Sequence, residues 1–131
     1  MKPLTSIEKR DLLAAEKYDE NIVRGYADEF FEQARYGDAF EFYCKLGDAG
    51  AVRRLKEAAV KQGDPDLLWR IEHQDRAIVS KQDWADCGES ALGLGKFRSA
   101  AYVFSRIGDE ERLAAAESNF KDPQEASQSP Q

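Results

Sequence analysis

Apolar residues recur along the chain at intervals of three and four positions, the period of a helix with one buried face. No run of β-branched residues alternates over five or more positions, as a half-buried strand would require. The pattern therefore predicts an all-α fold. The apolar stripes are Ala27, Phe30, Phe31 and Ala34; Val52, Leu55, Ala58 and Ala59; Leu67, Leu68 and Ile71; and Phe97, Ala100, Ala101 and Phe104.

The dipeptide Gly-Asp interrupts these stripes four times, at positions 37–38, 47–48, 63–64 and 108–109. Glycine readily adopts the left-handed conformation that follows the last turn of a helix. Aspartate begins the next helix because its carboxylate accepts free backbone N–H groups of the first turn. Each pair therefore predicts a helix end and a new start. A fifth turn is expected at Gly95-Lys96, which lacks the acidic cap.

Eight helices are expected between these turns, and short loops bring consecutive helices into antiparallel contact. The predicted fold is a stack of antiparallel helical hairpins that forms one helical-repeat domain over residues 1–120. The tail, residues 121–131, has no large apolar side chain and is expected to be disordered. The expected helices cover 6–18, 19–36, 38–46, 48–62, 65–73, 80–94, 96–107 and 109–120, with Thr5 or Ser6 capping the first and a capping box at Ser80.

Two stretches of the sequence are similar to each other. One begins Tyr26-Ala-Asp and reaches a glycine at 37, and the other begins Trp84-Ala-Asp and reaches a glycine at 95. The helix after each glycine ends in Leu-Gly-Asp or Ile-Gly-Asp. In this alignment the later copy carries three extra residues, 97–99, after its turn. Such self-similarity indicates a repeated supersecondary unit.

The later copy resembles the tetratricopeptide repeat family, well over residues 82–115, while residues 24–58 match loosely. The resemblance implies that small residues let two helices approach closely while aromatic residues fill the remaining space. The residues that carry it are Trp84, Gly88, Gly95, Phe97, Ala100 and Phe104.

The chain departs from the family pattern at several positions. Cys87, Ala91 and Arg112 stand where the family favours leucine, tyrosine and proline, and Phe30 is aligned with the small residue in the early copy. A related helical-hairpin solenoid, of the coatomer or clathrin-linker type, is the alternative, since its helices also end in Gly-Asp turns.

The resemblance implies a non-enzymatic protein-interaction module that binds a peptide or protein segment in a groove lined by the first helix of each hairpin. Because Asp86 and Glu89 are acidic, a basic or apolar segment is expected rather than a peptide C-terminus. A self-associating scaffold is the alternative, because three or more repeats are usually needed for a stable stack. The implied groove positions are Arg24, Ala27, Phe31 and Ala34 in the early copy and Gln82, Ala85, Glu89 and Leu92 in the later one.

Charge argues against two classes of partner. The chain has 19 Lys and Arg residues against 25 Asp and Glu residues, a net charge of −6 that repels phosphate backbones and anionic membrane surfaces. We therefore expect neither nucleic acid nor a membrane as a partner. The N-terminus has no apolar run, and no stretch approaches the roughly 18 apolar residues of a spanning helix, so a cytoplasmic location is expected.

Few side chains suggest catalysis or metal binding, and no catalytic residue, cofactor or metal is expected. His73, the one histidine, lies near Glu72 and Asp75, and an enzyme that uses His73 and these carboxylates is a remote alternative. Histidine is also favourable at a helix C-terminus. Cys44 and Cys87 are expected to act as small buried hydrophobic residues.

Overall fold

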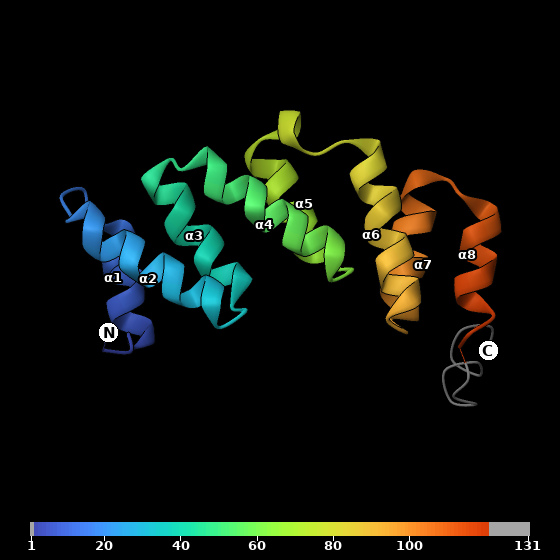
Figure 1. Ribbon diagram of the computed structural model, residues 1–131, viewed down its shortest axis with the longest axis horizontal. Helices are drawn as coiled ribbons and strands as arrows, with labels where there is room; N and C mark the ends of the chain where they lie inside the picture. The colour runs from blue at the N-terminus through green and yellow to red at the C-terminus, as the bar shows by residue number, and fades with distance from the viewer. Residues whose placement is uncertain (1, 121–131) are drawn as a thin grey trace. The chain divides into compact units, whose positions relative to one another are not determined.

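The computed structural model describes residues 2–120, and over this range the chain forms eight α-helices and a single turn of 3₁₀-helix, with no β-strand (Figure 1). The predicted all-α class is confirmed. The predicted disorder of residues 121–131 lies outside the described residues. The elements are α1 (Ser6–Ala14), α2 (Glu20–Glu32), α3 (Tyr36–Leu46), α4 (Ala49–Lys61), α5 (Pro65–Gln74), η1 (Arg76–Ile78), α6 (Lys81–Gly93), α7 (Phe97–Ile107) and α8 (Glu110–Glu117).

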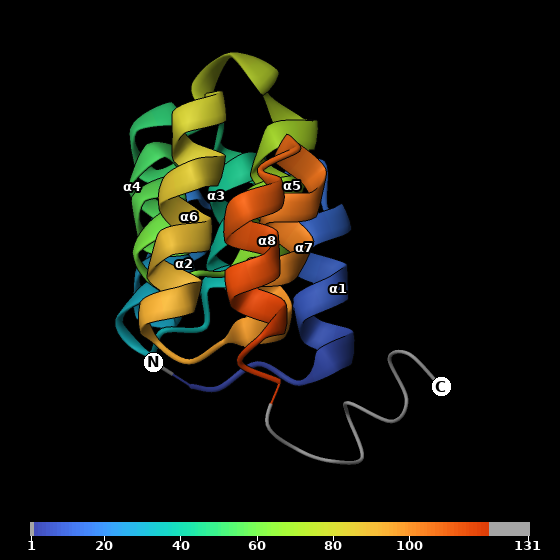
Figure 2. The same cartoon turned by 90° about the vertical axis from the view of Figure 1, so that its right-hand side faces the viewer.

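The chain divides into two compact units, Met1–Leu55 and Lys56–Gln131, with the boundary inside α4. In the first unit, α2 and α3 form an antiparallel hairpin whose core includes Val23, Phe42 and Tyr43. In the second unit, α6 packs against α7 and α7 against α8, as Figure 2 shows, around Ala91, Ala100 and Phe104. The single helical-repeat domain over residues 1–120 remains a prediction.

Aspartate caps begin α4, α5 and α8 as the sequence predicted, whereas Asp38, predicted to start a helix, lies inside the first turn of α3. The carboxylates of Asp48, Asp64 and Asp109 each accept a hydrogen bond, at 3.0–3.1 Å, from the backbone N–H three residues further on. Reciprocal capping boxes join Thr5 to Glu8 and Ser80 to Asp83. These bonds satisfy N–H groups that have no partner within the helix.

Five turns share one backbone geometry. One residue in each is left-handed, with φ between 59° and 76°. The N–H of the next residue donates to the carbonyl five positions earlier, at 2.8–3.1 Å, which is the long bond of the Schellman motif. The residues that accept this bond are all buried, so each helix end is tied to the core. The left-handed residues are Ala34, Gly47, Gly63, Gly95 and Gly108.

The turn between α2 and α3 differs from the prediction. Ala34, with φ 59°, takes the left-handed position, whereas Gly37 lies in the first turn of α3. The predicted helix end at Gly37 is therefore wrong. A left-handed alanine is unfavourable and gives no sequence signal, so the sequence pattern indicates the nearby Gly37 instead.

Placing this turn at Ala34 also corrects the internal alignment. Lys81 of α6 follows Glu20 of α2 by 61 residues, and Phe97 of α7 follows Tyr36 of α3 by the same 61. The later copy therefore carries no extra residues after its turn. In this register Ala27, not Phe30, is the early counterpart of Gly88.

Candidate binding surface

The residues that carry the repeat pattern form the packing between α5, α6 and α7. Trp84 on α6 is 3% exposed, and its indole N–H donates to the Glu72 carboxylate on α5 at 3.1 Å. Arg106 on α7 donates to the same carboxylate at 2.8 Å and lies 4.5 Å above the Trp84 ring. One acid, one aromatic ring and one cation therefore connect three helices.

Gly88 sets the distance between α6 and α7. A Cβ atom there would lie 2.8 Å from the ring of Phe104, closer than real side chains approach. Ala100 and Phe104 on α7 are fully buried. Gly95 is left-handed in the turn between the two helices, and Phe97, the first residue of α7, is partly exposed.

Several residues expected in the groove of the first helices have partners within the chain. Arg24 forms a 2.6 Å ion pair with Asp48, and Glu89 forms one of 2.7 Å with Arg112. The exposed Gln82 donates to Asp86 on its own helix at 2.8 Å.

The apolar residues expected in that groove are largely covered. Phe31 is partly buried in an edge-to-face contact with Tyr36, and Leu92 packs against the second unit's core. Ala27 is fully buried, so its expected place in the groove is wrong. Its small side chain is buried in the hairpin at the position that corresponds to Gly88 in the later copy. Ala34 is an exposed turn residue, and Ala85 is partly exposed.

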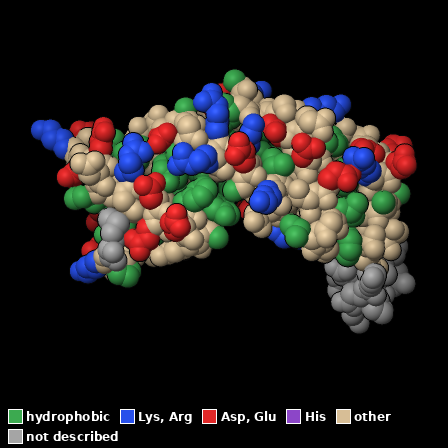
Figure 3. Space-filling model, in the orientation of Figure 1, with side chains coloured by type: hydrophobic (Ala, Val, Ile, Leu, Met, Phe, Trp, Pro, Cys, Tyr) green, Lys and Arg blue, Asp and Glu red, His purple; other side chains and the backbone are tan. Residues whose placement is uncertain are grey.

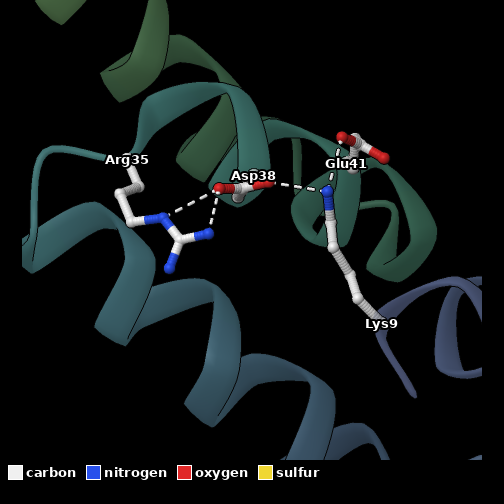
Figure 4. Close-up of polar contacts among 4 residues, drawn as sticks. All are labelled: Lys9, Arg35, Asp38 and Glu41. Atoms are coloured by element: carbon white, nitrogen blue, oxygen red, sulfur yellow. Dashed lines mark hydrogen bonds and ion pairs between the residues drawn. The ribbon is translucent and has the colours of Figure 1, made fainter. Parts of the chain in front are cut away.

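A cavity of about 550 Å³ lies between α1, the end of α2 and the start of α3. Figure 4 shows Asp38 between two cations on its wall: Lys9 donates to Asp38 at 2.6 Å and to Glu41 at 3.0 Å, and Arg35 donates to Asp38 at 2.9 Å. Lys9, Arg35, Asp38 and Glu41 are therefore joined in one network, which connects α1 to α3.

Pairing shifts the pKa values of the two central groups in opposite directions. Burial alone would raise the pKa of Asp38, but its hydrogen bond with Lys9 and the nearby Arg35 charge lower it overall. Burial would lower the pKa of Lys9, and its hydrogen bonds with Asp38 and Glu41 raise it overall. Both shifts favour the charged forms and hence the ion pairs.

A second groove, of about 480 Å³, runs between α5 and α7 and presents two exposed aromatic side chains. Trp69 on α5 is 40% exposed and Tyr102 on α7 is 48% exposed. We call this surface the aromatic groove. It is lined by Pro65, Asp66 and Trp69 from α5 and by Arg98, Ser99 and Tyr102 from α7.

The side chains of the aromatic groove differ in how they are held. The His73 ring stacks on Trp69 with centroids 3.7 Å apart, and its Nδ1 lies 3.1 Å from the Trp69 carbonyl oxygen. Arg98 lies 5.1 Å from the centre of the Phe120 ring. Within residues 2–120, Asp66 has neither an ion-pair nor a hydrogen-bond partner. The groove therefore offers an unpaired carboxylate beside two aromatic rings.

The hydrophobic pattern of the sequence does not predict this groove. Trp69 lies outside the apolar stripe of Leu67, Leu68 and Ile71, and Tyr102 lies outside that of Phe97, Ala100 and Phe104. A large aromatic residue on the polar face of each of two helices is the signal that could have indicated it.

The side chains considered for catalysis have separate structural partners. Glu72 binds Trp84 and Arg106, His73 stacks on Trp69, and Asp75 accepts a 3.0 Å hydrogen bond from the Ala77 N–H. Across residues 2–120, no three His, Cys, Asp or Glu side chains converge as a metal site requires.

The two cysteines are thiols in different environments. Cys87 is fully buried, and burial together with the Asp64 charge raises its pKa to about 12. Cys44 is partly exposed. A thiol with so high a pKa stays protonated at neutral pH, so Cys87 acts as a small apolar side chain.

No protein-family model, curated protein or solved structure matches the chain. The resemblance of residues 82–115 therefore depends on their own pattern. In the part of the chain that the structure describes, no helix has both the length and the apolar character needed to cross a membrane. On the face drawn in Figure 3, acidic and basic side chains are interspersed.

Proposed function

We propose that the chain is a non-enzymatic protein-interaction module of the tetratricopeptide-like helical-hairpin type, acting in the cytoplasm. The observation that supports this proposal is the aromatic groove. It presents Trp69 and Tyr102 from two different helices beside a hollow of about 480 Å³. Tryptophan and tyrosine are the residues most enriched among those that dominate binding energy at protein interfaces.

The proposed site lies on the second helices of the hairpins rather than the first. Arg24 and Glu89, which the resemblance assigned to the first helices, form ion pairs within the chain, and Leu92 is part of the core packing. A partner that used these side chains would compete with the contacts they make within the chain. Trp69 and Tyr102 are already exposed, so a partner gains apolar burial against them.

Catalysis is not part of the proposal. An enzyme built on His73 would need a nearby carboxylate that is available for proton transfer. Glu72 is held by Trp84 and Arg106, and Asp75 caps η1. The geometry therefore supports structural roles for these acids.

The experiment that tests the proposal has two stages. The full chain is used to capture partners from its host, and the bound segment is mapped, purified and titrated by calorimetry. The double variant Trp69→Ala/Tyr102→Ala is expected to weaken binding of the purified segment by at least about a hundredfold. Leu94→Ala, which removes another exposed apolar side chain at 56% exposure, is the matched control and should leave binding unchanged.

Two outcomes would contradict the proposal. If both variants bind the purified segment as tightly as the parent, the aromatic groove is not the binding site. If no segment binds the purified chain at micromolar concentration, the interaction role itself is wrong. Circular dichroism of each variant confirms that its helices are intact.

A further inference from the structure

We propose that the segment bound in the aromatic groove is extended, contains prolines in a polyproline II conformation and carries a basic residue. This inference depends on the proposed function and names the class of its partner. It follows from three properties of the groove: the nature of its apolar surface, its unused hydrogen-bond donors and its charge.

The apolar surface of the groove is made of three rings, two of which are flat and aromatic. Its apolar contributors are Trp69, Tyr102 and Pro65, whereas Asp66, Arg98 and Ser99 are polar. An amphipathic helix lays a continuous apolar stripe into its groove and would bury much of that stripe against these polar groups. Proline rings dock between aromatic side chains, and the segment's backbone stays in contact with polar groups.

The same aromatic side chains carry hydrogen-bond donors that the chain itself does not use. Among residues 2–120, neither the Trp69 indole N–H nor the Tyr102 hydroxyl has a hydrogen-bond partner, whereas the buried Trp84 indole donates to Glu72. A polyproline II segment has no internal hydrogen bonds, so its carbonyl oxygens are available as acceptors. The Trp69 and Tyr102 side chains can both pack against prolines and donate to carbonyl oxygens, so they suit a polyproline II segment.

The charge of the groove and of the whole chain is the reason to infer a basic residue in the bound segment. Asp66 is exposed in the first turn of α5 and forms no ion pair within the described residues, while Arg98, on the α7 side of the same groove, packs against Phe120. The net charge of −6 also attracts a basic segment. A cation on the segment would therefore pair with Asp66 while the prolines cover the two rings.

The test titrates the full, ¹⁵N-labelled chain with synthetic peptides and follows its two indole N–H signals by NMR. The parent peptide has three Arg-Pro-Pro-Pro repeats. One matched peptide replaces prolines by alanines, another replaces arginines by glutamates, and a third is an amphipathic helix of equal net charge. Trp69→Phe assigns its signal, and Trp84 is an internal reference because it is buried.

The parent peptide is expected to shift the Trp69 signal and to leave that of Trp84 in place. Replacing its prolines or arginines should weaken binding by about tenfold or more. Asp66→Lys should weaken binding of the arginine peptide and strengthen binding of the glutamate peptide. Simple loss of folding would not produce this reversal.

Other results overturn the inference. If the alanine or helical peptide binds the groove as tightly as the parent, the partner class is wrong while the proposed function stands. If no peptide shifts the Trp69 signal, the inference fails, and the captured natural segment tests the function separately. A shift that depends on protein concentration, or on removing residues 121–131, would assign the groove to a second copy or to the chain's own tail.

Discussion

Gly63 lacks a side chain for two reasons that act at the same position. Its backbone is left-handed, with φ 61°, and a Cβ atom would lie 2.6 Å from the backbone of Ala91 on α6. Gly95 has the same kind of backbone, with φ 76°, but nothing lies within 4 Å of the Cβ position. A side chain added at Gly95 would have only the strain of a left-handed backbone, whereas one added at Gly63 would also collide with α6.

Gly63→Ala is predicted to lower the free energy of unfolding by about 3 kcal/mol or more, since the Ala91 backbone cannot move away without shifting α6. Gly95→Ala, the matched control, should lower it by only about 1 kcal/mol, the effect of a left-handed alanine. Urea denaturation of both variants measures the difference. Equal losses would show that the close approach between Gly63 and Ala91 does not constrain the fold.

The sequence predicted individual turn residues well where glycine and aspartate occur together. Gly47, Gly63 and Gly108 are left-handed, and the aspartate after each caps the next helix. Ala34 could not be predicted, because it is left-handed against the preference of alanine, in a turn closed by hydrogen bonds from the Ala34 and Arg35 N–H groups to carbonyls of α2. Local chemistry is readable from the chain, and a strained residue stabilised by its surroundings is not.

Among the elements, α1 depends most visibly on charge. It has no buried residue of its own, and Lys9 connects it to Asp38 and Glu41 on α3. The lowered pKa of Asp38 means that its contribution is fully present above its unfolded pKa of about 4 and is lost as the pH falls through the lower folded value. The raised pKa of Lys9 means that its contribution holds below about pH 10 and is lost at higher pH.

Asp38→Asn is therefore predicted to lower the free energy of unfolding by about 1 kcal/mol at pH 7, with the difference from the parent shrinking as the pH falls below about 4. The measurement is urea denaturation at both pH values. Asp11→Asn is the matched control, because Asp11 is 70% exposed and lies 3.9 Å from Arg10. A loss for Asp38→Asn that stays constant with pH would contradict the ionic explanation.

The helices themselves were predictable, whereas the contacts between them were less so. Apolar periodicity and caps gave all eight helices within a few residues of their ends, apart from the turn at Ala34. Lys9 and Asp38 are 29 positions apart, and Trp69 and Tyr102 are 33 apart on separate helices. The polar positions of a helix show no repeating pattern from which contacts between distant residues can be inferred. The network at α1 and the aromatic groove can therefore be recognised only from the packed structure.

For the whole molecule, self-association is the alternative to the proposed interaction role. The large hydrophobic side chains exposed in residues 2–120 are Ile7, Ile22, Trp69, Leu94 and Tyr102. Trp69 and Tyr102 share a groove of about 480 Å³, which is small beside the broad apolar patches that hold subunits together.

The chain is therefore predicted to sediment as a monomer from low to high micromolar concentration, because its net charge of −6 also opposes association. Sedimentation velocity at several concentrations, at low and at physiological salt, measures this. A mass that rises with concentration would favour the scaffold alternative. The Trp69→Ala/Tyr102→Ala variant would then show whether the groove is the contact.

The identical spacing of the two hairpins has a consequence for exchanging segments within the chain. Each runs from a capped start through a left-handed turn to a closing glycine, over Glu20–Gly47 and Lys81–Gly108, with no insertion or deletion between them. Because both ends coincide, exchanging one hairpin sequence for the other would preserve the length of every helix and of the turn between them.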